Sequence, residues 1–382
     1  MFDPLTTQLV WTSFYDQARP SRRRWPPFRR TSPPRSDVPL PPPEAAVDRT
    51  RRRRTGALTG AVAALALTLT GGLFTGTAAS AADTGARAVP KHAVTGYWQN
   101  FDNGAQVQKL GDVQDEYDII AVSFADATGT PGEVTFNLDS AGLGGYTVDQ
   151  FKADIKAKQA AGKSVIVSVG GEKGAVAVND AASANAFADS VHELMQEYGF
   201  DGVDIDLENG LNSTYMTQAL KSLAGKAGSG LVLTMAPQTI DMQSPSTEYF
   251  KTALAVKDIL TVVNMQYYNS GSMLGCDGKV YSQGTVDFLT GLACIQLENG
   301  LAPSQVGIGV PASSRAAGGG YVAPEVVNNA LDCLAKGTGC GSFKPSRTYP
   351  DIRGAMTWST NWDATAGSAW SKSVGAHVHG LP

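Results

Sequence analysis

The residues with the clearest chemical potential lie in one short segment, FDGVDIDLENG at 200–210. Asp204, Asp206 and Glu208 alternate there with apolar residues, so in an extended strand the three carboxylates share one face. Carboxylates spaced about 6.5 Å apart on a poorly solvated strand cannot all ionise, so the pKa of at least one must rise. A carboxylic acid that stays protonated near neutral pH is a candidate general acid.

Two other roles also suit acids at alternate positions. A calcium-binding loop needs a glycine at its sixth position and an acid at its twelfth, but Asn209 and Tyr215 stand there. A solvent-exposed strand would carry the same charges without any chemistry, and alternation alone does not exclude it. The spacing therefore disfavours calcium and leaves catalysis and an exposed strand as open alternatives.

The acidic segment is one of eight short apolar segments that alternate with helix-like segments. These are residues 94–98, 119–124, 164–169, 202–207, 231–236, 261–266, 306–310 and 353–358. Amphipathic stretches such as 148–162 and 183–199 each close on a glycine that suits a helix C-terminus, and 368–379 can supply the eighth helix. The alternation predicts one α/β domain over 94–382, a single (β/α)8 TIM barrel with the acids lining its interior toward the C-terminal rim.

The residues before this domain have a different composition. Residues 1–54 hold 12 Arg, no Lys and 5 acidic residues, which predicts a disordered Arg/Pro-rich extension over 1–50, or a start site assigned too early with Val47 as the alternative start. Residues 51–82 have the layout of a signal peptide, and 83–93 form a short linker. A membrane anchor is the alternative for the apolar run. We expect a secreted, extracellular protein without stable membrane association after cleavage, exported by the Sec or the twin-arginine route.

The exported part is acidic. Without the N-terminal charges, 19 Lys and Arg remain against 30 Asp and Glu, a net charge near −11. A surface for nucleic acid is basic, so nucleic-acid binding is not expected. The length matches one barrel domain, and we expect a monomer.

All four cysteines lie in the exported part, where oxidising conditions favour disulfides. Three pairings are possible, and proximity in the sequence favours Cys276 with Cys294 and Cys333 with Cys340. Metal binding is the alternative, but there is no CxxC pair and the four His are scattered. We expect disulfides and no metal.

The pattern Asp201-x-x-Asp204-x-Asp206-x-Glu208 resembles the DxxDxDxE signature of glycoside hydrolase family 18, the chitinase family. The resemblance continues, in the family's order, through SVGG at 168–171, MAPQ at 235–238, MQYYN at 265–269 and Trp358, and it covers about residues 94–375. The chain is most similar to secreted actinobacterial-type chitinases of the compact subgroup that lacks an extra α+β insertion.

This resemblance implies a role for each acid. Glu208 matches the family's proton donor, and Asp206 shares a proton with Asp204 and turns or polarises toward the substrate. No carboxylate nucleophile is needed, because the acetamido oxygen of the sugar attacks the anomeric carbon and configuration is retained. Gln266 and Tyr268 are expected to reach the acetamido group. The family needs no cofactor.

The resemblance also implies contacts with the sugar. Trp358 is expected to form the floor beneath the sugar that is cleaved, and Met265, Gln238 and Asn269 fall in motifs that meet the substrate. Many relatives carry Asp where this chain has Asn269, and some carry Glu at Gln238, so one sugar contact and the pH optimum are left open. Ser168, Gly170 and Gly171 are expected to support the acids and to give room at a strand end.

Aromatic residues at the ends of the first two strands are weaker candidates for the same cleft. These are Tyr97, Trp98 and Phe124. For each of them, packing in the core is the favoured alternative.

Together these features predict a secreted endo-chitinase that acts on chitin and chitooligosaccharides. Endo action is expected because the insertion that deepens the cleft in relatives is missing. An endo-β-N-acetylglucosaminidase acting on N-glycans is the alternative within the family. A non-catalytic chitin-binding lectin is a further alternative, disfavoured because Glu208 is present.

Overall fold

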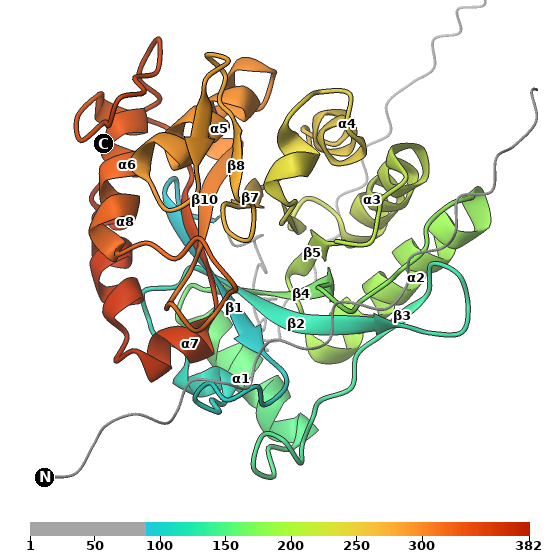
Figure 1. Cartoon of the computed structure of the whole chain (residues 1–382). Coiled ribbons are helices and arrows are strands. Elements are labelled where there is room, and N and C mark those ends of the chain that lie inside the picture. Colours follow the sequence, from blue (N-terminus) through green and yellow to red (C-terminus); the bar gives the residue numbers. More distant parts are fainter. Residues whose placement is uncertain (1–88) are drawn as a thin grey trace, which may run out of the picture. The chain divides into compact units, whose positions relative to one another are not determined.

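Eight parallel strands close into a barrel in the part of the chain that the computed structural model describes, residues 89–382 (Figure 1). They are β1 (Ala93–Gln99), β2 (Ile119–Ala127), β4 (Ser164–Gly170), β5 (Gly202–Asp206), β6 (Val232–Met235), β7 (Val262–Gln266), β10 (Val306–Pro311) and β11 (Gly354–Trp358). Strand β1 pairs with both β2 and β11, which closes the sheet. The predicted (β/α)8 barrel is confirmed.

The predictions for the N-terminal region concern residues that the structure does not describe. The extension at 1–50 and the signal peptide at 51–82 lie outside residues 89–382, as does most of the linker at 83–93. These three assignments stay predictions.

Helices follow the strands and form the outer layer of the barrel (Figure 1). They are α1 (Val148–Ala160), α2 (Ala181–Tyr198), α3 (Ser213–Ala227), α4 (Glu248–Ala255), α5 (Val286–Glu298), α6 (Pro324–Lys336), α7 (Thr360–Thr365) and α8 (Ala376–His379). The connection from β1 to β2 differs, because it contains only the 3₁₀ turn η1 (Leu110–Asp112). Its first residues, NFDNG at 100–104, favour turns over a helix. The predicted eighth helix is built from the π-helical turn η4 (Ser371–Gly375) and α8.

Local sequence signals set the ends of the helices that follow β2 and β4. Thr147 caps α1 in a capping box with Gln150, and Asp180 caps α2 by accepting a hydrogen bond from the Ser183 N–H. Gly199 ends α2 in the left-handed conformation with φ of 83°, which a residue with a side chain adopts at a cost. The chain is thereby returned to the barrel directly before β5.

The strands divide their side chains between two apolar layers. Val203, Ile205 and Leu207 belong to the large core between strands and helices. A smaller cluster fills the barrel interior, mostly from the first half of each strand, and includes Ile119, Ile166, Val232 and Val262. The C-terminal half of the interior is left to polar side chains, at the face where barrels of this type bind ligands.

Both predicted disulfides are present. Cys276 lies in the turn of the hairpin β8 (Ser272–Leu274) and β9 (Val280–Ser282) and bonds to Cys294 on α5. Cys333 on α6 bonds to Cys340. Sequence proximity therefore identified the correct pairing among the three that were possible.

Within residues 89–382, no helix combines the length and the apolar composition that a membrane span requires.

Candidate active site

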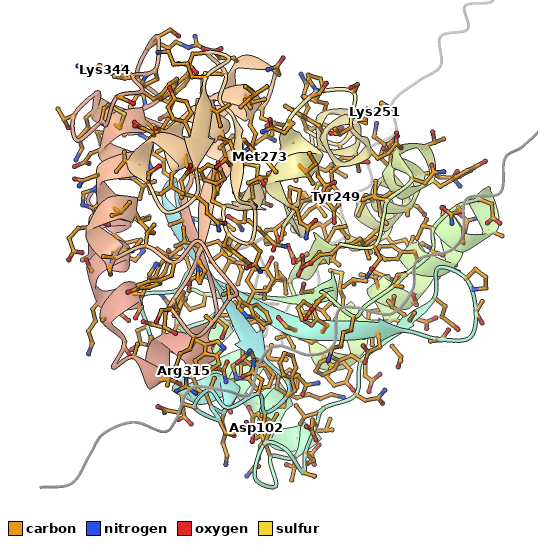
Figure 2. All side chains as sticks on the ribbon, in the orientation of Figure 1. Asp102, Tyr249, Lys251, Met273, Arg315 and Lys344 are labelled. Atoms are coloured by element: carbon orange, nitrogen blue, oxygen red, sulfur yellow. A yellow bond between two sulfur atoms is a disulfide. The ribbon has the colours of Figure 1, made fainter. Side chains whose placement is uncertain are left out.

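A cleft of about 1290 Å³ opens at the C-terminal ends of the barrel strands. It extends across this face, since Asp102 and Met273 both line it, and Figure 2 shows Met273 above the barrel mouth and Asp102 below it. The residues lining it that the sequence predicted are Phe124, Asp206, Glu208, Gln238, Gln266, Tyr268, Asn269 and Trp358. These predicted residues therefore line a cleft at the face where parallel barrels present their ligand-binding groups.

Strand β5 places its acids inside the barrel, as its alternation predicted. Asp204 is fully buried and Asp206 is 5% exposed, whereas Val203 and Ile205 face the helices. Glu208 follows the last residue of β5 by two positions and is half-buried at the rim. An exposed strand of solvated charges is thereby excluded.

Asp204 is surrounded by hydroxyl groups. Its Oδ2 accepts hydrogen bonds from Tyr97 Oη and Ser168 Oγ, each at 2.7 Å, and its Oδ1 accepts one from Thr234 Oγ1 at 2.6 Å. Burial raises the pKa of Asp204, but all three hydroxyls stabilise the carboxylate and oppose that rise. The hydroxyls come from three different strands, so only closure of the barrel assembles this set.

Asp206 has less compensation for its burial. Burial raises its pKa well above the ordinary value, and the charges of Asp204 and Glu208 raise it further, against one hydrogen bond from Gln266 Nε2 to Oδ1 at 2.8 Å. Asp204 thus has three donors that favour its charged form and Asp206 has one, so the pKa of Asp206 is raised more strongly than that of Asp204.

Glu208 stands where the cleft is still open to solvent. Burial raises its pKa, and the charges of Glu172 and Asp241 raise it further. Two amides oppose this rise, because Gln238 Nε2 donates to Oε2 at 3.2 Å and Gln266 Nε2 to Oε1 at 3.4 Å. A carboxyl group with a raised pKa and access to the cleft has the properties of a general acid.

Gln266 and Tyr268 complete the polar group around the acids. Gln266 Nε2 also donates to the Ala236 carbonyl at 2.8 Å, so this amide is held between β6 and β5. Burial raises the pKa of Tyr268 well above its ordinary value, with Asp206 and Glu208 adding to the rise. Its hydroxyl therefore remains a donor, and no residue within 89–382 accepts a hydrogen bond from it.

Three aromatic rings form one side of the cleft. The rings of Phe124 and Trp358 stack at a centroid distance of 5.7 Å, and Phe101 lies 6.4 Å from Trp358 and 6.5 Å from Phe124. All three line the cleft and are partly exposed. Sugar rings pack their C–H faces on such surfaces, so the cluster can hold a sugar beside the acids. Gly171 leaves room for it, since a Cβ there would lie 2.7 Å from the Phe124 ring.

Three candidates lie outside the cleft. Tyr97 is 2% exposed and reaches the site only through its hydrogen bond to Asp204. Trp98 is fully buried and stacks on Phe151, as the packing alternative predicted. Met265 is 1% exposed and packs in the outer core, because its neighbour Gln266 faces inward and side chains alternate along β7. The position of Met265 gives no support to the substrate contact expected of it.

Gln238 and Asn269 both line the cleft. Gln238 contacts the proposed acid directly, as described above. Asn269 Oδ1 accepts a hydrogen bond from the Gly319 N–H at 3.0 Å, which ties the end of β7 to the loop after β10. Its φ of 52° lies in the left-handed region, where Asn is tolerated better than most residues.

Several residues at the site escaped the sequence-based prediction. Phe101 is an aromatic residue two positions after β1, and this position could have identified it. Glu172 follows the SVGG motif directly and also lines the cleft. Tyr249 gave no signal at all: it lies on α4, and its hydroxyl accepts the Leu207 N–H at 2.6 Å, which holds the strand end between the two upper acids.

Within residues 89–382, three side chains that could each offer a ligand atom to a metal ion lie close together. They are Cys276, Cys294 and Glu298, and both sulfur atoms of this group are joined in a disulfide. This group lies on the hairpin and α5, and none of its members lines the cleft.

Known proteins are similar to this chain over the residues that carry the motifs. The model of glycosyl hydrolases family 18 matches residues 93–376. Chitinase Chi52 of Paenibacillus xylanexedens is 36% identical over 75% of this chain and 61% of its own length, and Exochitinase 1 of Streptomyces olivaceoviridis is 36% identical over 74% and 55%. The chain thus covers under two thirds of these two relatives. A crystal structure of a proposed Chitinase A from Streptomyces coelicolor is 80% identical, with a TM-score of 0.76 over 76% of this chain and 99% of that one.

Proposed function

Because the chain belongs to glycosyl hydrolases family 18, we propose that it is a chitinase that hydrolyses β-1,4 linkages between N-acetylglucosamine units with retention of configuration. The observation that carries the proposal is the row of three acids that face the barrel interior and differ in their surroundings. Asp204 accepts hydrogen bonds from three hydroxyls, Asp206 is buried with a raised pKa and one amide donor, and Glu208 faces an open cleft beside an aromatic wall. No Lys, Arg or His within residues 89–382 forms an ion pair with any of them.

Glu208 acts as general acid and then as general base. Its raised pKa keeps a proton available for the glycosidic oxygen of the bound sugar. Once the leaving group departs, the Glu208 carboxylate takes a proton from the water that attacks the anomeric carbon from the same side. The half-buried position suits both steps, since water must enter for the second.

The acetamido group of the sugar acts as the nucleophile. Its carbonyl oxygen attacks the anomeric carbon and forms a cyclic oxazolinium ion, so no second carboxylate attacks. Asp206 accepts the acetamido N–H, and the positive charge on the ring draws the negative charge of the Asp204–Asp206 pair toward Asp206. The free hydroxyl of Tyr268 donates to the acetamido oxygen and orients it.

We further propose endo action and secretion. Endo action is supported by an open cleft with residues on both sides of the acids, although one relative is named an exochitinase. Viscosity of a soluble chitin derivative should fall early in the reaction, whereas release of disaccharide alone from the first turnover would contradict endo action.

Secretion is supported by the two disulfides, which form in oxidising compartments. Fractionation of the culture of a producing cell tests this, and retention of the protein in the cytoplasm would refute it.

The decisive experiment is product analysis with defined N-acetylglucosamine oligomers in water enriched in heavy oxygen. Mass spectrometry should show one heavy oxygen at each new reducing end, and chromatography of fresh products should show the β-anomer. Glu208→Gln should lower kcat by about a thousandfold or more while oligomer binding persists. Full activity of Glu208→Gln would remove Glu208 as the acid, and binding without any hydrolysis by the unmodified chain would indicate a lectin.

A further inference from the structure

The sequence contains three Asn-Gly pairs, at 103–104, 209–210 and 299–300. An asparagine before a glycine readily loses its side-chain amide, because glycine leaves the backbone mobile and has no side chain to hinder attack by its backbone nitrogen. Two of the pairs lie in the same pentapeptide, LENGL, at 207–211 and 297–301. The chain therefore carries two copies of one reactive sequence in different structural surroundings.

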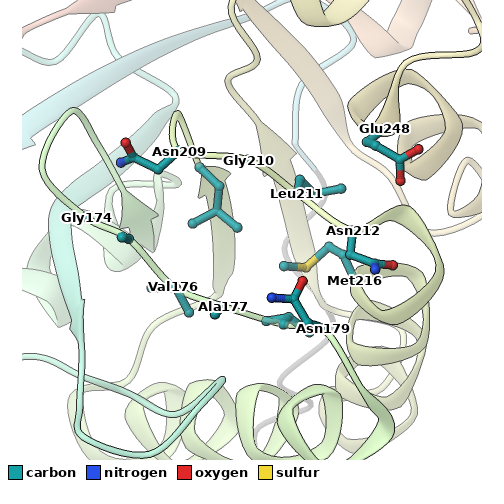
Figure 3. Close-up of a pocket in the computed structure, with 13 residues that line it drawn as sticks. Gly174, Val176, Ala177, Asn179, Asn209, Gly210, Leu211, Asn212, Met216 and Glu248 are labelled. Atoms are coloured by element: carbon teal, nitrogen blue, oxygen red, sulfur yellow. The ribbon is translucent and has the colours of Figure 1, made fainter. Parts of the chain in front are cut away.

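The first copy follows β5 and contains the proposed acid, Glu208. Asn209 and Gly210 are exposed and line a pocket of about 430 Å³ beside the cleft, and Figure 3 shows the Asn209 amide turned toward the loop that carries Gly174. Within residues 89–382, the Gly210 N–H donates no hydrogen bond, and a Cβ at Gly210 would meet no atom within 4 Å. The Asn209 amide is held by one long hydrogen bond, from Nδ2 to the Glu172 carbonyl at 3.4 Å. The nitrogen and the amide that would react are thus weakly restrained.

The second copy ends α5 and is restrained. Asn299 is the C-cap residue with a ψ of 22°, and its Nδ2 donates to the Ile295 carbonyl at 2.8 Å. Its backbone N–H donates to the same carbonyl at 3.2 Å. To bring its side chain to the Gly300 nitrogen, Asn299 must break the 2.8 Å hydrogen bond and leave the helix end.

The third pair is also restrained. The Gly104 N–H donates to Asp102 Oδ1 at 2.8 Å, and Asn103 Oδ1 accepts the Ala105 N–H at 3.3 Å. The nitrogen that would attack and the amide that would be attacked are therefore both held by other partners. Of the three asparagines, Asn209 is the one whose reaction requires the least rearrangement.

We propose that Asn209 is a site of spontaneous deamidation that ages the active site. The Gly210 nitrogen attacks Asn209 Cγ and forms a C–N bond, and the Cγ–Nδ2 bond breaks as ammonia leaves with the proton of the attacking nitrogen. Water then opens the succinimide ring. Cleavage of the new bond to Cγ gives aspartate, whereas cleavage at the main-chain carbonyl gives isoaspartate, in which the main chain runs through the side-chain carbons.

Either product changes the surroundings of Glu208. Both place a carboxylate in the next residue and remove the donor that links Asn209 to the Glu172 carbonyl. Isoaspartate also lengthens the main chain after Glu208 by one carbon, about 1.5 Å, and a misplacement of about 1 Å at an active site can lower a rate about a hundredfold. The loss of activity rests on the proposed function, whereas the deamidation itself does not.

Peptide mapping by mass spectrometry tests the site. The purified chain is kept in mildly alkaline buffer at physiological temperature and is sampled over time. Asn209 should convert about tenfold faster than Asn299 or more, because a further hydrogen bond must break at Asn299. In denaturant, where only the shared pentapeptide acts, the two rates should be nearly equal. Equal rates in the folded chain, or slower conversion at Asn209, would overturn the inference.

Hydrolysis of an N-acetylglucosamine oligomer tests the effect on Glu208. The kcat of the aged chain should fall in proportion to its content of isoaspartate. Asn209→Ser has no side-chain amide to lose and should keep its initial kcat over the same incubation, whereas Asn299→Ser, the matched control, should lose activity as the unmodified chain does.

The outcomes separate the two proposals. An equal loss of activity in Asn209→Ser, or full activity in converted protein, would overturn the claim that this site ages the enzyme. If the fresh chain hydrolyses no oligomer, the proposed function fails, and the mass spectra still decide whether Asn209 is the site of deamidation.

Discussion

Both ends of this barrel bury carboxylates, but the side chains that contact these carboxylates differ between the two ends. At the N-terminal end, Asp118 is 7% exposed and contacts His379 Nε2 at 2.8 Å and Lys163 Nζ at 3.6 Å, and it accepts the Val94 N–H at 2.9 Å. At the C-terminal end, Asp204 and Asp206 are equally buried, yet their hydrogen-bond partners are hydroxyls and an amide.

This difference separates a structural charge from a functional one. A buried carboxylate that is paired with a lysine and with further nitrogen donors is compensated, and removing it leaves those partners unpaired. A buried carboxylate with neutral partners keeps a raised pKa and a proton that it can exchange. The proposed chemistry therefore lies at the end of the barrel where no cation pairs with the buried carboxylates, and their burial costs some stability there.

Asp206→Asn should give the largest effect. It removes the carboxylate that stabilises the oxazolinium ion in the proposed mechanism, so kcat should fall by about a hundredfold or more, measured on an N-acetylglucosamine oligomer. Its unfolding free energy should nevertheless rise. Because the folded pKa of Asp206 is raised, the unfolded chain loses this proton first, and the folded state is increasingly disfavoured as pH rises above about 4.

The stability advantage of Asp206→Asn over the unmodified chain should therefore grow from acidic toward neutral pH. Urea unfolding at several pH values measures it. An advantage that shrinks as pH rises would show that Asp206 is compensated in the folded state after all.

Asp118→Asn is the matched change at the other end and should have the reverse outcome. It weakens contacts with Lys163 and His379, so unfolding free energy should fall by about 2–3 kcal/mol. Specific activity below the unfolding range should be unchanged, because Asp118 is at the far end of the barrel. Denaturant unfolding and oligomer hydrolysis on the same sample test both statements, and a loss of kcat in folded protein would contradict the division between the two ends.

Tyr249→Phe tests whether the Tyr249 hydroxyl holds the end of β5 in position. The hydroxyl accepts the Leu207 N–H at 2.6 Å, and its loss leaves a buried donor unpaired between Asp206 and Glu208. We expect kcat to fall about three- to tenfold with little change in KM, since the strand end that positions both acids loosens. Equal changes in kcat and KM for Tyr249→Phe, or none, would mean that Tyr249 only fills space.

Gln238→Leu should give the smallest effect, a shift in pH dependence. Gln238 Nε2 stabilises the charged form of Glu208, so its loss should raise the pKa of Glu208 further while Glu172, Asp206, Asp241 and Gln266 stay in place. Glu208 must be protonated to act as acid, so the alkaline limb of kcat should move upward by about 0.4–1 pH unit.

Gln159→Leu, on α1 away from the cleft, is the matched control for Gln238→Leu and should leave the profile unchanged. A downward shift of the alkaline limb in Gln238→Leu would show that Gln238 does not stabilise the carboxylate form of Glu208.

Much of the architecture could be predicted because it depends on short-range order. The period of two in 202–208 assigned the acids to one face, and glycines at helix ends separated the strands correctly. The disulfides followed from sequence proximity, since short loops close most readily. The connection after β1 forms a 3₁₀ turn where the alternation predicted a helix, because the local helix pattern is weak there. Met265 lies in the outer core because side chains alternate along β7.

Closure of the barrel determines which residues that are distant in the sequence come into contact. Tyr97, Ser168 and Thr234 are far apart in sequence, yet they converge on Asp204 because β1, β4 and β6 are brought around the same axis. A pocket of about 430 Å³ likewise forms only where the loops after β4 and β5 meet Met216 of α3 and Glu248 of α4. Side-chain periodicity is a property of neighbouring residues and can be read along the chain, whereas a pKa and a cavity depend on which distant groups the packed strands bring within a few ångströms.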